Sequence, residues 1–343
     1  MADKKHLYCC SSYYQLLISL IKSFTQRQKI DLVLEEHGIE TASQLAQRLE
    51  CQTDCVGKVF VCPNSETIDP YQQRCASFFP WQRRQILSHM EQVFAGAASS
   101  IPKNYDTIHV FWDLGYAGTY FNICKICYTL HEDSLNSYQH IRENRRNYSY
   151  LFRKWGLKYF FKKYLHMGVM PFGYSDCCNA VEVNDRKGIQ IPQEKVREVP
   201  RAELESQLSQ EQRETIYDIF MGDLKFEISS IDHPVLILTE PFAVTGRLPD
   251  LEIQAKLYHA IQAEYAKGEN ILIKPHPRDS MDYKNYFPRA KVLAKNVPME
   301  VLNFHKEFKV SKAITVTSSA LQGIHCAEEK IYLGQEFLHK FIK

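Results

Sequence analysis

Several motifs that would by themselves indicate an activity are missing from this sequence of 343 residues. There is no G-x-G-x-x-G and no G-x-x-x-x-G-K-S/T, which disfavours a dinucleotide oxidoreductase and a P-loop enzyme. No apolar run approaches the roughly 18 residues that a membrane-spanning helix needs. A strong excess of one charge is also missing, since the net charge is only +2, so the composition gives no argument for nucleic-acid binding.

Cysteine is plentiful, with 11 residues, but the spacing of a metal site is lacking. Cys124 and Cys127 form a C-x-x-C, yet no second C-x-x-C and no H-x-x-x-H follows at zinc spacing. The pair lies in an apolar pattern typical of a helix, so we expect it to pack in the core. The chain opens with the charged run Met-Ala-Asp-Lys-Lys rather than with a signal peptide. We therefore expect a reduced, cytoplasmic protein without a metal ion.

Short apolar runs that read as strands alternate with helical patterns along the whole chain. In the first half, strands are expected at 7–10, 58–62 and 107–112, and helices at 16–24, 82–94 and 120–130. In the second half, strands are expected at 235–239, 271–274, 313–317 and 331–333, and helices at 251–267 and 320–329. This alternation predicts parallel sheets that helices cover on both faces.

The two halves are separated by a polar stretch that is poor in aromatic residues. We expect an N-terminal Rossmann-like domain on the acceptor side at 1–185, a linker or excursion at 186–225, and a C-terminal nucleotide-donor domain at 226–343. The predicted fold class is α/β, with two Rossmann-like domains that face each other across a cleft. This arrangement is called GT-B in glycosyltransferases, and it can hold a donor phosphate on strand-end loops without a glycine fingerprint.

The most informative segment is the basic loop that follows the expected strand at 271–273. It contains Lys274, Pro275, His276 and Arg278, and the flanking prolines prevent the chain from continuing as helix or strand. Ligands of parallel sheets bind outside the carboxyl ends of the strands, so this loop is a candidate phosphate site. The alternative is a solvated basic turn.

Three short motifs, in a fixed order, carry a resemblance to a known family. Asp113-Leu114-Gly115 follows a strand in the first half, Lys-Pro-His-Pro follows one in the second, and Ser318-Ser319 comes about forty residues later. This order resembles the D/E-D/E-G, HP and S/T motifs of the bacterial sialyltransferases. Ser12–Leu17 and the Leu238–Pro241 segment are similar to glycosyltransferase family 52, the lipooligosaccharide sialyltransferase family. Lys-Pro-His-Pro alone also occurs in teichoic-acid glycerophosphotransferases, so the ordered set carries the specificity.

The resemblance implies transfer of sialic acid from CMP-sialic acid to a terminal sugar of a bacterial lipooligosaccharide or capsular glycan. It also implies inversion at the sugar carbon and no cofactor or metal, which agrees with the absence of an Asp-x-Asp motif. His276 would donate a hydrogen bond or proton to the leaving phosphate, and Lys274 would add a point charge. The other residues that the resemblance assigns to substrate binding are Pro275, Arg278, Thr317, Ser318, Ser319, Gly115 and Glu240.

The identity of the catalytic base is open, because the first motif has Asp113 as its single carboxylate where the family has two acidic residues. Members of the family are thought to use an acidic residue shortly upstream of the HP motif, where this sequence has Asp250 and Glu252. Asp113 and Asp250 are therefore rival candidates. Their structural alternatives are a turn residue and a helix cap, respectively.

Basic and aromatic residues are interleaved between Arg142 and Lys163. Such a segment suits an anionic membrane surface or a phosphorylated glycolipid acceptor, and the alternative is a helix that packs its aromatic side chains into the core. The partners that we expect are a nucleotide-sugar donor and a glycan or glycolipid acceptor, on the inner face of the membrane, with no nucleic acid. A homodimer is open, because family members can dimerise. The alternative functions are a hexosyltransferase of the same family, a glycerophosphotransferase, and an inactive glycan-binding protein.

Overall fold

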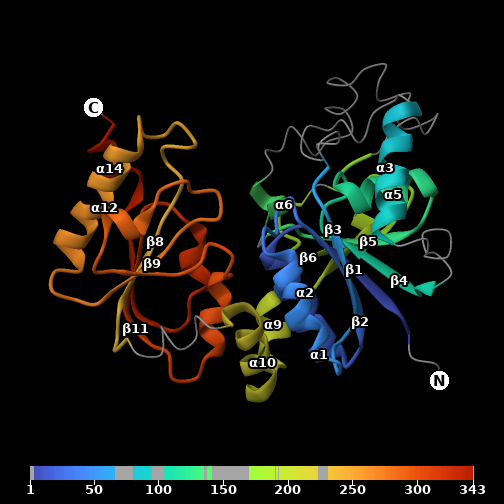
Figure 1. Ribbon diagram of the computed structural model, residues 1–343, viewed down its shortest axis with the longest axis horizontal. Coiled ribbons are helices and arrows are strands. Elements are labelled where there is room, and N and C mark those ends of the chain that lie inside the picture. Colours follow the sequence, from blue (N-terminus) through green and yellow to red (C-terminus); the bar gives the residue numbers. More distant parts are fainter. Residues whose placement is uncertain are drawn as a thin grey trace. The chain divides into compact units, whose positions relative to one another are not determined.

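The computed structural model describes residues 4–65, 80–94, 104–134, 137–140, 170–189, 191, 193–222 and 231–342. The chain divides into two compact units, with the boundary between Leu208 and Ser209. Each unit is an α/β structure built on a parallel sheet (Figure 1). We call them unit 1 and unit 2.

The sheet of unit 1 has the strand order β3-β2-β1-β4-β5-β6-β7, and all neighbouring strands are parallel. The strands are β1 (His6–Cys10), β2 (Ile30–Glu35), β3 (Val56–Cys62), β4 (Thr107–Val110), β5 (Tyr128–His131), β6 (Cys178–Val183) and β7 (Val196–Glu198). The direction of winding reverses between β1 and β4. In Rossmann-like sheets this reversal opens a crevice at the carboxyl ends of the strands.

Helices of unit 1 begin and end at residues that stop the hydrogen-bond ladder. Ser12 caps the first helix by accepting a hydrogen bond from the backbone N–H of Gln15 at 3.3 Å, and the helix ends at Arg27 in the left-handed conformation, with φ of 50°. The helical elements are α1 (Tyr13–Gln26), α2 (Ala42–Glu50), α3 (Pro80–Val93), α5 (Tyr116–Cys124), α6 (Ser137–His140), the 3-10 helix η3 (Gln193–Lys195) and α9 (Arg201–Ser206).

Unit 2 repeats the same winding on a smaller scale, with the strand order β10-β9-β8-β11-β12 and parallel neighbours throughout. The strands are β8 (Val235–Leu238), β9 (Ile271–Lys274), β10 (Lys291–Val292), β11 (Val310–Thr315) and β12 (Ala327–Tyr332). The helical elements are α10 (Gln210–Met221), α12 (Leu251–Tyr265), α13 (Tyr283–Tyr286), η4 (Met299–Phe304), η5 (Ser319–Gly323) and α14 (Gly334–His339). Here the winding reverses between β8 and β11.

The prediction of an α/β fold with two Rossmann-like halves is confirmed, but two helices were placed wrongly. The helix expected at 120–130 ends at Cys124, because Lys125 adopts the left-handed conformation, with φ of 55°, and residues 128–131 form β5. The helix expected at 320–329 is instead the five-residue η5 followed by β12. The side chain of Asn303 accepts hydrogen bonds from the backbone N–H groups of His325 and Cys326, which holds this segment extended.

Two further expectations differ from the structure. The segment 186–225, expected as a linker, contains β7, α9 and α10, and the boundary between the units falls inside it. Cys124 and Cys127 are exposed rather than packed in the core. Within the described ranges, no group of three His, Cys, Asp or Glu residues has the geometry of a metal site. No helix in those ranges is long and apolar enough to span a bilayer.

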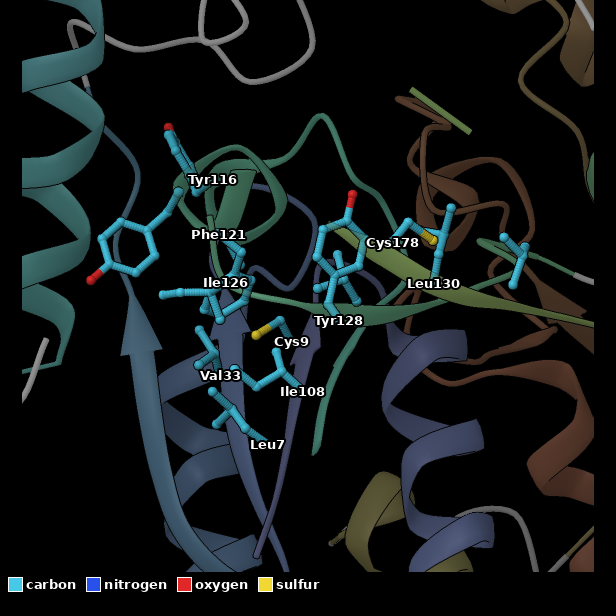
Figure 2. Close-up of a cluster of buried hydrophobic side chains, with 14 of the residues drawn as sticks. Leu7, Cys9, Val33, Ile108, Tyr116, Phe121, Ile126, Tyr128, Leu130 and Cys178 are labelled. Carbon is cyan, nitrogen blue, oxygen red and sulfur yellow. The ribbon is translucent and has the colours of Figure 1, made fainter. Parts of the chain in front are cut away.

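One face of the unit 1 sheet forms an apolar core with α3 and α5. Leu7 and Cys9 of β1, Val33 of β2 and Ile108 of β4 are buried against Phe121 of α5 (Figure 2). The alternation of side chains along a strand places these residues on one side of the sheet. Because neighbouring strands share the same pattern, the core is continuous from β2 to β5.

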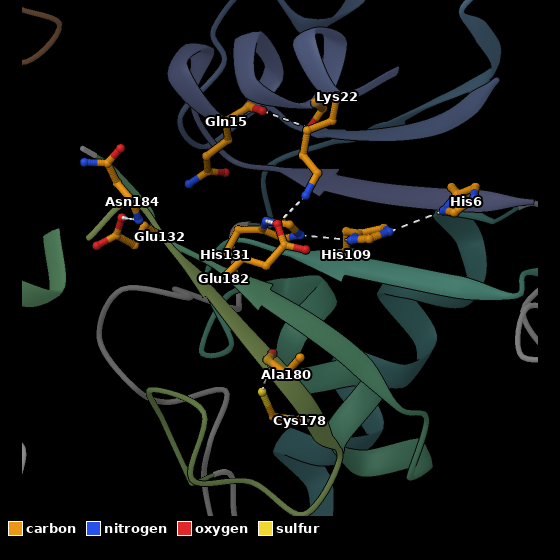
Figure 3. Close-up of polar contacts among 11 residues, drawn as sticks. His6, Gln15, Lys22, His109, His131, Glu132, Cys178, Ala180, Glu182 and Asn184 are labelled. Atoms are coloured by element: carbon orange, nitrogen blue, oxygen red, sulfur yellow. Dashed lines mark hydrogen bonds and ion pairs between the residues drawn. The ribbon is translucent and has the colours of Figure 1, made fainter. Parts of the chain in front are cut away.

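The opposite face of the unit 1 sheet buries a chain of imidazoles (Figure 3). His109 Nδ1 lies 2.9 Å from His131 Nε2, and His109 Nε2 lies 3.5 Å from His6 Nδ1. His131 Nδ1 lies 3.3 Å from the carboxylate of Glu182, which also binds the ammonium of Lys22 from α1. In a neutral chain His6 donates an N–H to His109 and His109 donates one to His131, so that the N–H of His131 faces Glu182. Burial lowers the pKa of all three histidines.

We expect this imidazole chain to weaken the fold as the solution is acidified. The folded protein keeps the rings neutral, whereas the unfolded chain takes up protons below about pH 6.5, so the free energy of unfolding falls with pH. Asp113 and Glu35 act in the opposite sense, because burial raises their pKa values to about 6 and about 7. The wild type should therefore lose its advantage over His109→Gln between pH 7 and pH 5, by up to about 1.4 kcal/mol per pH unit in urea titrations.

The control is Gln44→Ala, since Gln44 is exposed on α2 and its side chain does not titrate. Its difference from the wild type should be the same at both pH values. A constant difference for His109→Gln as well would show that the carboxylates of Glu182 and Asp106 already compensate a protonated ring and outweigh the cations Lys22 and Arg201.

Candidate active site

The candidate site in unit 2 lies at the carboxyl edge of the sheet, where it is assembled from the end of β8 and two loops. Strand β8 is hydrogen-bonded to β9 on one side and to β11 on the other. We call residues 274–279, after β9, the HP loop, and residues 317–319, after β11, the serine loop. The two loops lie about 10 Å apart, which is the width of two strand spacings. They flank the reversal of winding, where ligands of doubly wound sheets bind.

The dipeptide that ends β8 joins the two loops. On the HP side, Thr239 Oγ1 accepts a hydrogen bond from the backbone N–H of His276 at 3.2 Å. On the serine side, the buried carboxylate of Glu240 accepts hydrogen bonds from the backbone N–H of Thr317 at 2.8 Å and from the hydroxyl of Thr315 at 3.3 Å. It also accepts one from the hydroxyl of Thr317. Both loops are therefore fixed to the same strand end.

His276 is oriented by the backbone of its own loop. Its Nδ1 accepts a hydrogen bond from the N–H of Arg278 at 3.1 Å, so in the neutral ring the proton is on Nε2. Burial, followed by the charges of Arg278 and Lys274, lowers the pKa of His276 to about 4. In the free protein at neutral pH this imidazole is therefore a hydrogen-bond donor through Nε2 rather than a cation.

Lys274 does not present its charge to a ligand as expected. Its ammonium is buried and donates hydrogen bonds to the carbonyls of Pro275 at 2.8 Å and Lys295 at 3.1 Å. Burial lowers its pKa to about 7, against the opposing effect of the Glu300 carboxylate. Lys274 therefore supports the HP loop from within, whereas Pro275 is buried and Arg278 is exposed.

Two further acidic residues at this edge were not singled out from the sequence. Asp279 is buried and accepts hydrogen bonds from Gln254 at 3.0 Å and from the hydroxyl of Tyr283 at 2.6 Å, which anchors the end of the HP loop. Glu300 lies beside Gly323 of η5, where a Cβ would be 3.6 Å from its carboxylate oxygen. The position of Asp279 three residues after His276 was visible in the sequence, but its partners were not.

The serine loop opens a short helical turn. Ser318 Oγ accepts a hydrogen bond from the N–H of Ala320 at 3.2 Å and so caps η5, and its own N–H donates to Thr315 Oγ1 at 3.3 Å. Ser319 is the first residue of η5. Thr317 contacts both Glu240 and Arg247, whose guanidinium donates a hydrogen bond to Thr317 Oγ1 at 3.1 Å. The structure thus brings Thr317, Ser318 and Glu240 together.

Asp113 in unit 1 lies in a different environment from the unit 2 residues. It is 1% exposed, and its carboxylate accepts a hydrogen bond from the N–H of Gly173 at 3.1 Å. Burial raises its pKa to about 6. Gly115 precedes α5 at the same strand end, and a Cβ there would lie 3.5 Å from the carboxylate of Glu35. Glu35 is therefore a second buried acid at this edge, which the one-acid motif Asp113-Leu114-Gly115 does not reveal.

Asp250, the rival candidate for the base, is exposed. One carboxylate oxygen, Oδ1, accepts a hydrogen bond from the N–H of Ile253 at 2.8 Å and caps α12. The cap that the sequence suggests is therefore present, and it occupies one of the two oxygens. Among the described residues, no partner is assigned to Oδ2, so Asp250 can both cap the helix and accept a proton.

Solved structures of other proteins share the fold of this chain. The solved 2,6-sialyltransferase of Photobacterium sp. JT-ISH-224, in complex with CMP and lactose, aligns with a TM-score of 0.53 over 97% of this chain and 72% of that one, at 10% identity. The UDP-GlcNAc 2-epimerase of Methanocaldococcus jannaschii, in complex with UDP-GlcNAc and UDP, aligns with a TM-score of 0.53 over 99% and 91%, at 10% identity. At these identities the likeness concerns the fold alone. The fold is that of GT-B glycosyltransferases.

The family is defined by the sequence. The profile of glycosyltransferase family 52 matches residues 122–333, which is more than half of the chain. The protein belongs to glycosyltransferase family 52. An uncharacterized protein of Haemophilus influenzae (strain ATCC 51907 / DSM 11121 / KW20 / Rd) is 33% identical over 111 residues, and this match covers 32% of the present chain and 35% of that protein.

Removing the Glu240 carboxylate should loosen the serine loop. In Glu240→Ala the backbone N–H of Thr317 loses its acceptor, so we expect unit 2 to be destabilised by about 1–3 kcal/mol in urea unfolding, and Glu240→Gln, which keeps one acceptor oxygen, to be affected less. Glu328→Ala, at an exposed position of β12, is the control and should change stability by less than about 0.5 kcal/mol. Equal effects of the two alanine variants would contradict the role assigned to Glu240.

Proposed function

We propose that this glycosyltransferase transfers sialic acid from CMP-sialic acid to a terminal sugar of a bacterial lipooligosaccharide or capsular glycan, with inversion and without a metal ion. The observation that most supports this is the joining of the HP loop and the serine loop by Thr239 and Glu240 at the reversal of winding. This geometry fixes the HP loop and the serine loop on either side of the end of β8.

The proposal also draws on the order of the motifs and on the family. Sialyltransferases use the three motifs that the sequence resembles, and family 52 covers the segment with the HP and serine loops. The Photobacterium enzyme with the same fold was solved with CMP and lactose. A cavity of about 370 Å³ beside Pro275, lined also by Tyr283, Leu293 and Lys295, offers space for a nucleobase next to the HP loop.

In the proposed reaction, the bond between C2 of sialic acid and the phosphate oxygen breaks through an oxocarbenium-like state. The acceptor hydroxyl forms its bond to C2 on the opposite face and gives its proton to a carboxylate. His276 Nε2–H donates to the departing phosphate, and the exposed guanidinium of Arg278 adds positive charge there. These donors supply the charge stabilisation for which other transferases use a divalent cation. From the other side, the hydroxyl of Ser318, which accepts a hydrogen bond from Ala320, can donate its own proton to the phosphate, while Thr317 is held by Glu240 and supports the loop.

We propose Asp250 as the base. Its carboxylate is exposed and has an oxygen available, whereas the carboxylate of Asp113 is enclosed by backbone donors. A proton acceptor must come within hydrogen-bond reach of the acceptor hydroxyl, and an enclosed carboxylate cannot do so without a rearrangement of the loop at Gly173. Asp113 then has a structural role.

The nature of the acceptor and the location of the enzyme belong to the same proposal. We expect a cytoplasmic enzyme that works at the inner face of the membrane, held there by the basic and aromatic segment between Arg142 and Lys163. This segment lies outside the described residues. Liposome flotation with and without anionic lipid tests the membrane contact, and a homodimer is tested by light scattering.

Donor hydrolysis tests the assignment of the substrate. Purified protein is incubated separately with CMP-sialic acid, UDP-glucose and CDP-glycerol, and nucleotide release is followed by anion-exchange chromatography. We expect CMP from CMP-sialic acid alone. The variant His276→Ala should release it at least about 100-fold more slowly, because one donor to the leaving group is lost.

Each other outcome points to a different function. Release from UDP-glucose would indicate a hexosyltransferase, release from CDP-glycerol a glycerophosphotransferase, and no release from any donor a glycan-binding protein. Near-normal release by His276→Ala, with the wild-type melting temperature, would remove the histidine from the mechanism.

Exchange of carboxylates tests the base. Asn is as good a helix cap as Asp, so Asp250→Asn should keep the melting temperature of the wild type while its turnover in transfer to lactose falls about 100-fold or more. Asp232→Asn, at an exposed carboxylate that precedes β8 at the opposite end of the strand, is the control and should keep full turnover. A variant Asp250→Asn with normal turnover, together with an inactive but folded Asp113→Asn, would transfer the role to Asp113.

A further inference from the structure

Arg247 is a cation held in a fixed position beside the serine loop. Its guanidinium donates hydrogen bonds to Thr317 Oγ1 at 3.1 Å and to Gln335 Oε1 at 2.9 Å, and it lies 4.7 Å from the centroid of the Phe242 ring. The turn that carries it is closed by a hydrogen bond from the N–H of Arg247 to the carbonyl of Phe242 at 2.8 Å. The side chain is half-buried, so part of the guanidinium faces solvent.

The acceptors that hold this guanidinium are neutral. Within the described part of unit 2, Arg247 has no ion pair with a carboxylate, and the nearby Glu240 directs its oxygens at Thr315 and Thr317. A guanidinium has five N–H donors in a rigid plane that matches a carboxylate or phosphate, and the two hydrogen bonds leave donors unused. The position is therefore prepared for an anion that the protein does not itself supply.

Lys274, Lys295 and Arg278, which are also cations at this edge, have other contacts. The ammonium of Lys274 donates to the carbonyls of Pro275 and Lys295, and that of Lys295 donates to the carbonyl of Asp279. Arg278 is exposed and belongs to the HP loop itself, next to His276. Arg247 contacts elements on the β11 and β12 side, whereas Arg278 follows β9, so β8 lies between the two positions. Two separated cationic positions match a donor with two separated anionic groups.

A CMP-activated sialic acid has this distribution of charge, with a phosphodiester and, on the sugar carbon that reacts, a carboxylate. We propose that Arg247 is a specificity-determining residue that binds the carboxylate of a 2-keto-sugar acid on the donor, while the HP loop binds the phosphate. The inference rests on the proposed function and extends it to the class of sugar. A neutral hexose has no group that would use Arg247.

Binding measurements separate the carboxylate from the phosphate. Dissociation constants are determined by calorimetry for CMP, for CMP-3-fluoro-sialic acid, which resists cleavage, and for the methyl ester of its carboxylate. The wild type should bind the ester at least about tenfold more weakly than the acid. In Arg247→Gln the acid should bind at least about tenfold more weakly than in the wild type, CMP should bind within about twofold, and the acid and ester should become nearly equal.

Arg278→Gln is the matched control, because it removes the other exposed guanidinium at this edge. It should weaken CMP and the acid by the same factor and leave the preference for acid over ester intact. Equal weakening of CMP and the acid in Arg247→Gln would assign Arg247 to the phosphate and overturn the inference, as would a wild type that does not distinguish acid from ester. The comparison of acid and ester uses the wild type alone, so it does not depend on whether any variant folds. A wild type that binds neither CMP nor the acid would overturn the proposed function and this inference with it.

Discussion

The carboxylate of Glu240 is the contact on which the geometry of the candidate site most depends. It is buried, and it accepts hydrogen bonds from the backbone and hydroxyl of Thr317 and from Thr315. A charged acceptor makes stronger hydrogen bonds than a neutral one, and a buried one must be satisfied. Because η5 is only five residues long, it cannot position the serine loop on its own. The end of β8 sets that position, and the same strand end holds the HP loop through Thr239.

The lysines and the arginines near the candidate site of unit 2 have different roles. Lys274 and Lys295 direct their ammonium groups at backbone carbonyls, where three rotatable N–H donors can satisfy several acceptors. They stabilise the HP loop, and because their N–H groups bind carbonyls they are less available to a ligand. Arg247 and Arg278 keep donors in reach of solvent. A planar guanidinium recognises an oxyanion with two parallel hydrogen bonds, so the residues left for recognition are those best suited to it.

The sequence was sufficient where the signal was local. The apolar run before Lys274 and the prolines on either side of His276 predict β9 and the stiff loop after it, and both are present. The sequence was insufficient where a distant residue, or one left-handed residue inside the segment, decides the conformation. Asn303 holds the segment after η5 extended, and a left-handed residue at 125 ends α5, so two helical patterns did not become the helices expected. Neither cause appears in the periodicity of the segment itself.

The same limitation applies to side chains in the site. Lys274 and Arg278 look equally available in a basic loop, and only the carbonyl of Lys295, 21 residues away, shows that the first is used within the protein. Asp113 looks like a base until the N–H of Gly173, 60 residues away, is seen to occupy it. Glu35 and Glu300 follow no motif quoted above, and their places beside Gly115 and Gly323 become apparent only when the strands are assembled. The sequence motifs thus predicted the strand ends at which the candidate site lies, but they did not predict which charged side chains there have no partner within the described part of the protein.

The two candidate bases, Asp113 of unit 1 and Asp250 of unit 2, lie in different surroundings, and this difference bears on which of them can act on a substrate. In unit 1, burial raises the pKa of Glu35 and of Asp113, and backbone N–H groups occupy an oxygen of each. Such carboxyls stabilise loops, and each would need a conformational change to reach a substrate hydroxyl. Asp250 of unit 2 is exposed, caps a helix with one oxygen and keeps the other available. A proton acceptor that needs no rearrangement has a lower kinetic barrier to use, which supports our proposal that unit 2 supplies both the leaving-group donors and the base.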